Sequence, residues 1–192
     1  MSKLLFVAFP ISEKWAELFL GERETYVGEE FKWTTKGNLH MTLAFLGAVE
    51  EDLIPEIKDA LLEIASIQKP FDLEWQGVEY GPEGKTPSMI WARFKDHISY
   101  GVLASRVIEE ISYILGKVET LKPIPHVTLA RLNKDAPKPK QFPELREAGV
   151  IGREEIMNIN SMCLMESRMT QDGSTYNTLA TFDFTGDPTS DE

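Results

Sequence analysis

Two histidines occur in the same short phrase at two distant places in the chain. The segment "NLHMTLAFLG" has Thr42 two residues after His40, and "IPHVTLARL" has Thr128 two residues after His126. The whole chain contains only three histidines. Because successive side chains of a β-strand alternate between its faces, each phrase would present one imidazole and one hydroxyl together.

Two such strands facing each other would suit in-line displacement at a phosphodiester. One neutral imidazole can take a proton from water, and the other, protonated, can give a proton to the departing ribose oxygen. Since the ordinary pKa of imidazole is about 6.5, both forms exist near neutral pH. The threonine hydroxyls can donate hydrogen bonds to the non-bridging phosphate oxygens, where charge is held in the transition state. This chemistry needs no metal ion.

The alternatives for these residues are weaker. A single histidine on a half-apolar strand is commonly a core residue, but the matching "TLA" and the matching place in each half of the chain favour a shared role. The third histidine, His97, stands in "KDHISYG" at the start of a predicted helix and is expected at the surface. Two strand histidines without a third metal-binding side chain nearby make a poor metal site. No nucleophile elbow or glycine-rich phosphate loop is present.

The charge of the chain limits its classes of partner. It has 31 acidic and 20 basic residues, a formal net charge of −11, which argues against a protein that coats nucleic acid. Residues 115–140, however, include the second phrase and contain six basic residues but only two acidic ones. This segment is either a local basic cleft or a solvated loop. The six are Lys117, Lys122, Arg131, Lys134, Lys138 and Lys140.

The compartment follows from cysteine content and from the apolar segments. The only cysteine, Cys163, excludes an intramolecular disulfide and suits a reducing environment. The apolar run Leu4–Ile11 is interpreted as a first core strand rather than a signal peptide, since no small-residue cleavage site follows it. No run reaches the roughly 18 apolar residues of a membrane span. We expect a cytoplasmic protein without a membrane partner.

Hydrophobic periodicity predicts the elements that carry the two phrases. Helices are expected after Ser12, over residues 50–67, and after a capping Asp96. Besides the two phrases, strands are expected at Leu4–Phe9, Phe71–Tyr80, Ser88–Phe94, Ile156–Glu166 and Tyr176–Phe184.

The order of these elements predicts an α+β fold of two similar lobes. A helix precedes a His-x-Thr strand in each half, and further strands follow, so antiparallel sheets are expected rather than a doubly wound parallel sheet. We expect one bilobal domain over residues 1–192 with a central cleft between pseudo-symmetric lobes. Residues 133–143 are predicted to be a surface loop, and residues 185–192 a frayed acidic tail.

The sequence resembles the two-histidine (2H) phosphoesterases, and within them the RNA 2′,3′-cyclic phosphodiesterases, also called 2′-5′ RNA ligases. The likeness runs nearly end to end and includes "LLFVAFP", "NLHMTLAFLG", "MIWARF", "PHVTLAR" and "ESRMTQDGSTYNTLATF". It implies a bilobal α+β fold, no metal or other cofactor, and hydrolysis of RNA 2′,3′-cyclic phosphate ends to 2′-phosphomonoesters.

Carried over by position, the resemblance assigns catalysis to His40 and His126. It assigns phosphate binding to Thr42, Thr128 and Arg131. Forming a 2′-phosphate requires the 3′ oxygen to leave, and the resemblance favours His40 as the acid and His126 as the base. Symmetry between the halves leaves the reverse order open.

Strand alternation alone would aim Arg131 away from His126, so its role requires the strand to end or bulge by Ala130. Tyr176 matches a family tyrosine near the last strand, with substrate contact or packing both open.

Other functions of the same cleft stay open from the sequence. One is ligation or cleavage of 2′-5′ linkages in tRNA halves or oligonucleotides, and another is binding of nucleotides or RNA ends without catalysis. The expected partners are RNA ends or nucleotides that carry a 2′,3′-cyclic phosphate, and a monomer is the default. The physiological RNA and the base preference are not fixed by the sequence.

Overall fold

The computed structural model describes residues 1–25, 30–82, 86–118, 122–133, 155–171 and 173–186. Within these residues the chain forms strands, α-helices and two short 3-10 helices. The strands are β1 (Ser2–Pro10), β2 (Phe31–Trp33), β3 (His40–Glu50), β4 (Phe71–Gly81), β5 (Met89–Phe94), β6 (His126–Leu132), β7 (Ile156–Ile159), β8 (Ser161–Thr170) and β9 (Gly173–Asp183). The helices are α1 (Glu13–Thr25), α2 (Ile54–Ile67), α3 (Ile98–Leu115), η1 (Lys36–Asn38) and η2 (Glu51–Leu53).

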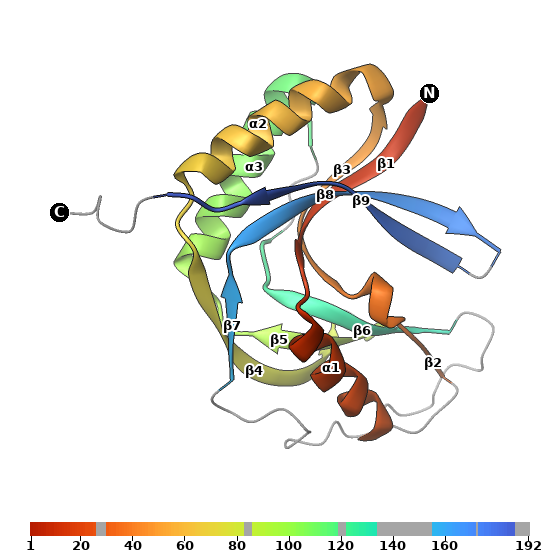
Figure 1. The fold of residues 1–192 in the computed structure, drawn as a ribbon. Helices are drawn as coiled ribbons and strands as arrows, with labels where there is room; N and C mark the ends of the chain where they lie inside the picture. The colour runs from red at the N-terminus through yellow and green to blue at the C-terminus, as the bar shows by residue number, and fades with distance from the viewer. Residues whose placement is uncertain (26–29, 83–85, 119–121, 134–154, 172, 187–192) are drawn as a thin grey trace.

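The strands form two antiparallel sheets, which confirms the predicted α+β class. The first sheet has the order β3-β1-β8-β9, and the second has the order β2-β6-β5-β4-β7. Each sheet contains one of the two His-x-Thr strands, β3 in the first and β6 in the second. Figure 1 shows the two sheets, with the β8–β9 hairpin extending to one side.

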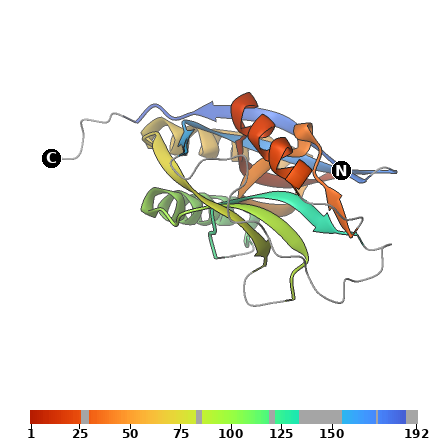
Figure 2. The same ribbon diagram turned by 90° about the horizontal axis from the view of Figure 1, so that it is seen from below.

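Helices α1 and α3 connect the two halves because each packs on the sheet of the other half. Helix α1 follows β1 of the first sheet, but its Trp15 lies against Trp75 and Phe94 of the second, at ring-centroid distances of 6.1 and 5.4 Å. Helix α3 follows β5 of the second sheet, yet its Tyr100 lies 5.8 Å from Phe9 of β1. Helices α2 and α3 lie side by side, away from α1 (Figure 1, Figure 2). One hydrophobic cluster therefore includes residues of both sheets.

The predicted strand Ile156–Glu166 is wrong in one respect, because it is divided between the sheets. Its first part, β7, pairs with β4 of the second sheet, and its second part, β8, pairs with β1 of the first. The apolar run hides this division, since the break falls at Asn160, whose carbonyl accepts a hydrogen bond from the backbone N–H of Phe184. The short strand β2 was also not predicted.

The predicted cap of the third helix is also wrong. His97, not Asp96, is the N-cap of α3, and its Nδ1 accepts a hydrogen bond of 3.2 Å from the backbone N–H of Ser99. Asp96 instead accepts a hydrogen bond of 2.8 Å from the guanidinium of Arg93. The predicted surface position of His97 is confirmed, and its ring stacks on Phe71.

The start of the expected acidic tail is ordered by hydrogen bonds. The backbone N–H of Thr185 donates to Ala65 and that of Gly186 donates to Gln68, at the end of α2. Residues 187–192 of the predicted tail and most of the predicted loop, 134–143, lie outside the described residues. Among the helices that the structure describes, none is long and apolar enough to cross a membrane.

The close approach of Gly186 to α2 generates a prediction about stability. A β-carbon at Gly186 would lie 2.5 Å from the carbonyl oxygen of Ile67, so Gly186→Ala forces the backbone apart. We expect its free energy of unfolding to fall by about 1–3 kcal/mol, as for other overpacked sites. Urea denaturation measures the change.

Gly101, inside α3, is the matched control, since a β-carbon there would have nothing within 4 Å. Gly101→Ala is expected to raise the free energy of unfolding by about 0.5–1 kcal/mol, because alanine loses less backbone entropy in a helix. Equal effects of the two alanines would contradict the packing of the C-terminal segment on α2.

Candidate active site

The two phrases form the predicted strands and share an irregularity. In each, the leucine after the threonine is a β-bulge: Leu43 has no partner on β1, and Leu129 has none on β5. The threonine and alanine on either side of each leucine pair with consecutive residues of the neighbouring strand. A bulge changes the face to which later side chains point. The internal repeat therefore extends from sequence to backbone geometry.

The bulge at Leu129 solves the problem posed by Arg131. After the extra residue, Arg131 returns to the face of His126 and Thr128, and all three line one cavity. The required bulge is thereby confirmed, one residue before Ala130. In the first phrase the equivalent residue is Phe45, five positions after its histidine, and it lines the same cavity.

This cavity of about 430 Å³ lies between strands of both sheets and helix α3. Its walls include Thr42 and Phe45 from β3, Thr128 and Arg131 from β6, and Tyr100 from α3. The charged side chains that line it, within the described parts of the chain, are those of Lys122 and Arg131, and no carboxylate is among them. In a protein with 31 acidic residues, this selection of cations favours an anionic ligand.

Each imidazole is oriented by the same hydrogen bond. The Nδ1 of His40 lies 2.7 Å from the carbonyl oxygen of Asn38, and the Nδ1 of His126 lies 2.8 Å from that of Ile124. A carbonyl can only accept, so Nδ1 carries the proton in both rings. The Nε2 atoms are thus the nitrogens available for proton exchange.

The rings that surround the two imidazoles differ. The ring of His40 contacts Phe6 and Tyr176, at centroid distances of 4.9 and 4.7 Å, and these two rings also contact each other at 5.3 Å. The ring of His126 stacks on Trp91 at 3.9 Å, with 29° between the planes. The site is therefore symmetric in backbone and asymmetric in side chains.

Burial is the main cause of a lowered pKa in both histidines. It lowers the pKa of His40, with a smaller contribution from the charge of Arg131. The pKa of His126 falls further, to about 4, through burial and then through the charges of Arg93, Arg131 and His40. The charge of His40 makes the smallest of these contributions.

Tyr100 of α3 contacts the backbone of both His-x-Thr phrases. The whole residue is only 1% exposed, and its hydroxyl donates a hydrogen bond of 2.8 Å to the backbone carbonyl of Thr42. It also lies 3.5 Å from the carbonyl of Ile124, the group that accepts from the Nδ1 of His126. Burial raises the pKa of Tyr100, so the hydroxyl keeps its proton.

The predicted residues come together in two groups. Thr42, His126, Thr128 and Arg131 line the cavity of about 430 Å³. His40 shares a strand face with Thr42 and contacts Tyr176, but it is not among the residues that line this cavity.

Sequence reasoning missed several residues of the site. Asn38 joins the first phrase to β9, since its side chain donates to the carbonyl of Ser174 and accepts from the N–H of Tyr176. Phe45 could have been found from its spacing, which repeats that of Arg131 in the second phrase. Nothing in the sequence signals that Trp91 faces a histidine.

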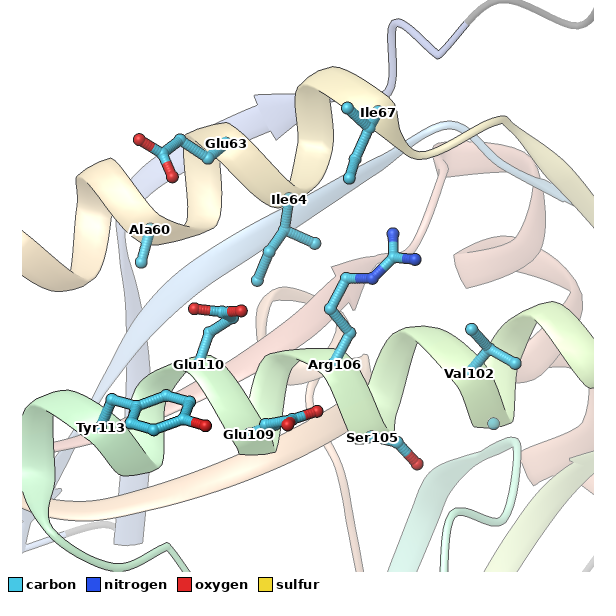
Figure 3. A pocket seen from close by; sticks show the side chains of 11 residues that line it. Ala60, Glu63, Ile64, Ile67, Val102, Ser105, Arg106, Glu109, Glu110 and Tyr113 are labelled. Atoms are coloured by element: carbon cyan, nitrogen blue, oxygen red, sulfur yellow. The ribbon is translucent and has the colours of Figure 1, made fainter. Parts of the chain in front are cut away.

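Two further observations concern other sites. In the part of the chain that is described, no group of three or more His, Cys, Asp or Glu side chains could hold a metal ion. A hollow of about 680 Å³ lies between α2 and α3, where side chains of both helices face each other (Figure 3). It contains none of the predicted site residues and three carboxylates, those of Glu63, Glu109 and Glu110.

Comparison with known proteins agrees with the resemblance. Residues 7–91 match the family model described as LigT like phosphoesterase. The RNA 2′,3′-cyclic phosphodiesterase of Aeropyrum pernix is 30% identical over 158 residues, which cover 80% of this chain and 86% of the relative. That of Thermus thermophilus is 26% identical over 191 residues, covering 96% and 91%.

Solved structures share the fold. The crystal structure of TT0787 of Thermus thermophilus superposes with a TM-score of 0.79 at 24% identity, covering 97% of this chain and all of the other. The apo form of Escherichia coli LigT gives a TM-score of 0.75 at 20% identity, covering 96% and 99%. With both His-x-Thr strands in place, the chain belongs to the family of LigT-like RNA 2′,3′-cyclic phosphodiesterases within the 2H phosphoesterases.

Proposed function

We propose that this protein hydrolyses the 2′,3′-cyclic phosphate ends of RNA to 2′-phosphomonoesters, with His40 and His126 as the acid–base pair. The observation that carries the proposal is the matched geometry of the two imidazoles. Both stand on equivalently bulged strands, both have Nδ1 fixed to a backbone carbonyl, and residues of both strands line a cavity whose charged lining is cationic. The family relatives named RNA 2′,3′-cyclic phosphodiesterase support the same reaction.

The phosphate is held by the residues that share the face of the histidines. The hydroxyls of Thr42 and Thr128 donate to its non-bridging oxygens, and the guanidinium of Arg131 balances the charge that grows on them in the transition state. Phe45, 45% exposed at the rim of the same cavity, offers an aromatic face on which a nucleobase can stack.

The two proton transfers are divided by the surroundings of the rings. His126, whose pKa is lowered to about 4, is neutral at neutral pH, and its Nε2 accepts a proton from water as the oxygen attacks phosphorus. The bond from phosphorus to the 3′ oxygen breaks, and Nε2–H of His40 protonates that oxygen. The negative charge of the bound phosphate raises the pKa of His40 and keeps it protonated in the complex. Exchange with solvent then restores both rings.

Both proton transfers use the protein's own imidazoles, so the reaction takes no metal or other cofactor. We place the enzyme in the cytoplasm as a monomer, with its single buried Cys163 unpaired.

Removal of either imidazole tests the acid–base pair. We expect His40→Ala and His126→Ala each to lower kcat by about 10²- to 10⁴-fold, because each removes one positioned proton transfer. Hydrolysis of a 2′,3′-cyclic-phosphate oligonucleotide, with chromatography of the 2′- and 3′-phosphate products, measures the effect. Substantial hydrolysis by the double variant would refute the mechanism.

The third histidine is the matched control. His97→Ala removes the side-chain cap of α3, so it is expected to cost about 0.5–2 kcal/mol of stability and to leave kcat unchanged.

The pH dependence tests the division of roles. The kcat/KM profile reports groups of the free enzyme. On the acid side, kcat/KM is expected to decrease as the pH drops below about 4, because His126 becomes protonated. On the alkaline side, kcat/KM is expected to decrease already below pH 6.5, because His40, with its lowered pKa, loses its proton. The alkaline limb of kcat is expected at higher pH, since the bound anion favours protonated His40. EDTA is expected to change neither profile; a flat kcat/KM from pH 5 to 9 would contradict the account.

The bond between Tyr100 and the first phrase generates a further prediction. Tyr100→Phe leaves the carbonyl of Thr42 without its buried donor and loosens the two strands relative to each other. We expect kcat to fall by about tenfold or more, because small misplacements of reacting groups are costly. Tyr113→Phe on the exposed face of α3 is the control, and equal kcat for the two variants would remove the role of Tyr100.

A further inference from the structure

Trp91 is a buried residue that does not belong to the hydrophobic core. Its neighbours on β5, Ile90 and Ala92, are both part of the core cluster. Trp91 is only 4% exposed but is absent from that cluster, because strand alternation turns it to the opposite face, where it lines the cavity. A large side chain is therefore buried on the face that carries the catalytic groups.

The indole projects from β5 and contacts residues of both neighbouring strands, β6 and β4. On the β6 side its ring stacks on His126, with centroids 3.9 Å apart. On the β4 side it lies so close to Gly81 that any β-carbon there would overlap the indole ring. Only glycine leaves enough space at residue 81 for the indole in this position.

The indole N–H makes tryptophan an unfavourable choice for simply filling space at this position. Nε1 of Trp91 is buried and has no hydrogen-bond partner among the described residues. A buried donor without an acceptor is destabilising, and a leucine or phenylalanine would fill apolar space without that cost. The choice of tryptophan is therefore better explained by its broad flat face than by its contribution to packing.

We propose that Trp91 is a positioning residue for His126, which holds the imidazole flat and shields it from water, and that Gly81 provides the space for this contact. The proposal deepens the function proposed above and rests on it for its catalytic meaning. Through this contact Trp91 fixes the direction of Nε2 and the water-poor surroundings of the base.

The electrostatic consequence follows from the groups around the ring. Burial is the first cause of the lowered pKa of His126, and Trp91 supplies the stacked surface of that burial. The charged or titratable groups that act on the ring are Arg93 from β5, Arg131 from its own strand and His40 from β3, and all three lower the pKa. With a smaller side chain at residue 91, water enters and the pKa of His126 rises, while these three groups are unchanged.

The test compares Trp91→Leu, Trp91→Phe and the control Trp75→Leu. Trp75 is buried among the rings of Trp15, Phe19 and Phe94, away from the imidazoles, so its replacement costs stability only. The pKa of His126 is measured by NMR titration of labelled histidine rings in each folded variant, assigned with His40→Asn and His97→Asn. The kcat/KM profile is measured in parallel.

We expect the pKa of His126 to rise by about one unit or more in Trp91→Leu, since desolvation shifts of several units are known for buried groups. In the same variant kcat/KM is expected to fall by about 10- to 100-fold, as for other displaced catalytic groups, with its acid limb moved to higher pH. In Trp91→Phe the pKa of His126 is expected to stay close to the wild-type value, and in Trp75→Leu it is expected to be unchanged.

An unchanged His126 titration in folded Trp91→Leu would overturn the proposal. If Trp91→Leu does not fold, Gly81→Ala tests the same contact, because its β-carbon displaces the indole. The pKa of His126 is then expected to rise. A wild-type His126 titration in Gly81→Ala would refute the role of Trp91. Because the titration needs no turnover, it remains interpretable even if the wild-type protein fails to hydrolyse cyclic phosphates.

Discussion

The hydrogen bond from each imidazole Nδ1 to the carbonyl two residues earlier is the constraint on which this site depends. It fixes the tautomer and directs Nε2 away from the backbone, in His40 through Asn38 and in His126 through Ile124. An imidazole without that bond would exchange tautomers and rotate, and neither ring could be relied on to give or to take a proton. The bulge after each threonine adds the second requirement, because it returns Arg131 and Phe45 to the face of the histidines.

The fold keeps these two strands in a fixed relation by crossing its helices. Helix α1 packs on the second sheet and α3 on the first, so that neither lobe buries its apolar surface without the other. Tyr100 continues this exchange into the site, where its hydroxyl donates to the strand of the opposite half. The same crossing explains why a repeated sequence gives one shared cavity rather than two independent sites.

Side chains, rather than the backbone, break the symmetry of the two histidines. The imidazole of His126 lies against the flat face of Trp91 and has its pKa lowered to about 4, whereas His40 contacts the smaller rings of Phe6 and Tyr176. Equivalent backbone positions thereby acquire different proton affinities. This difference supports the assignment of His126 as base and His40 as acid, which the repeat alone leaves open.

The sequence predicted the parts of the molecule that depend on local rules. Strand alternation placed His40 with Thr42 and His126 with Thr128, and the need for a bulge near Ala130 was confirmed at Leu129. The errors arose where tertiary contacts decide. The predicted strand Ile156–Glu166 is divided at Asn160 because its first part pairs with β4 and its second part with β1. The carboxylate of Asp96 binds the guanidinium of Arg93 and so does not cap α3. The contact of Trp91 with His126 joins residues 35 positions apart across two strands, which no local pattern reveals.

The central claim is that both imidazoles act on one phosphorus atom. A crystal structure of the protein with a nucleoside 2′-phosphate, the product of the proposed reaction, tests this most directly. The account predicts a single phosphate group with oxygens about 2.6–3.2 Å from Nε2 of both His40 and His126, the range of productive proton transfer. A phosphate that reaches only one of the two rings, or that binds in the hollow between α2 and α3, would contradict it.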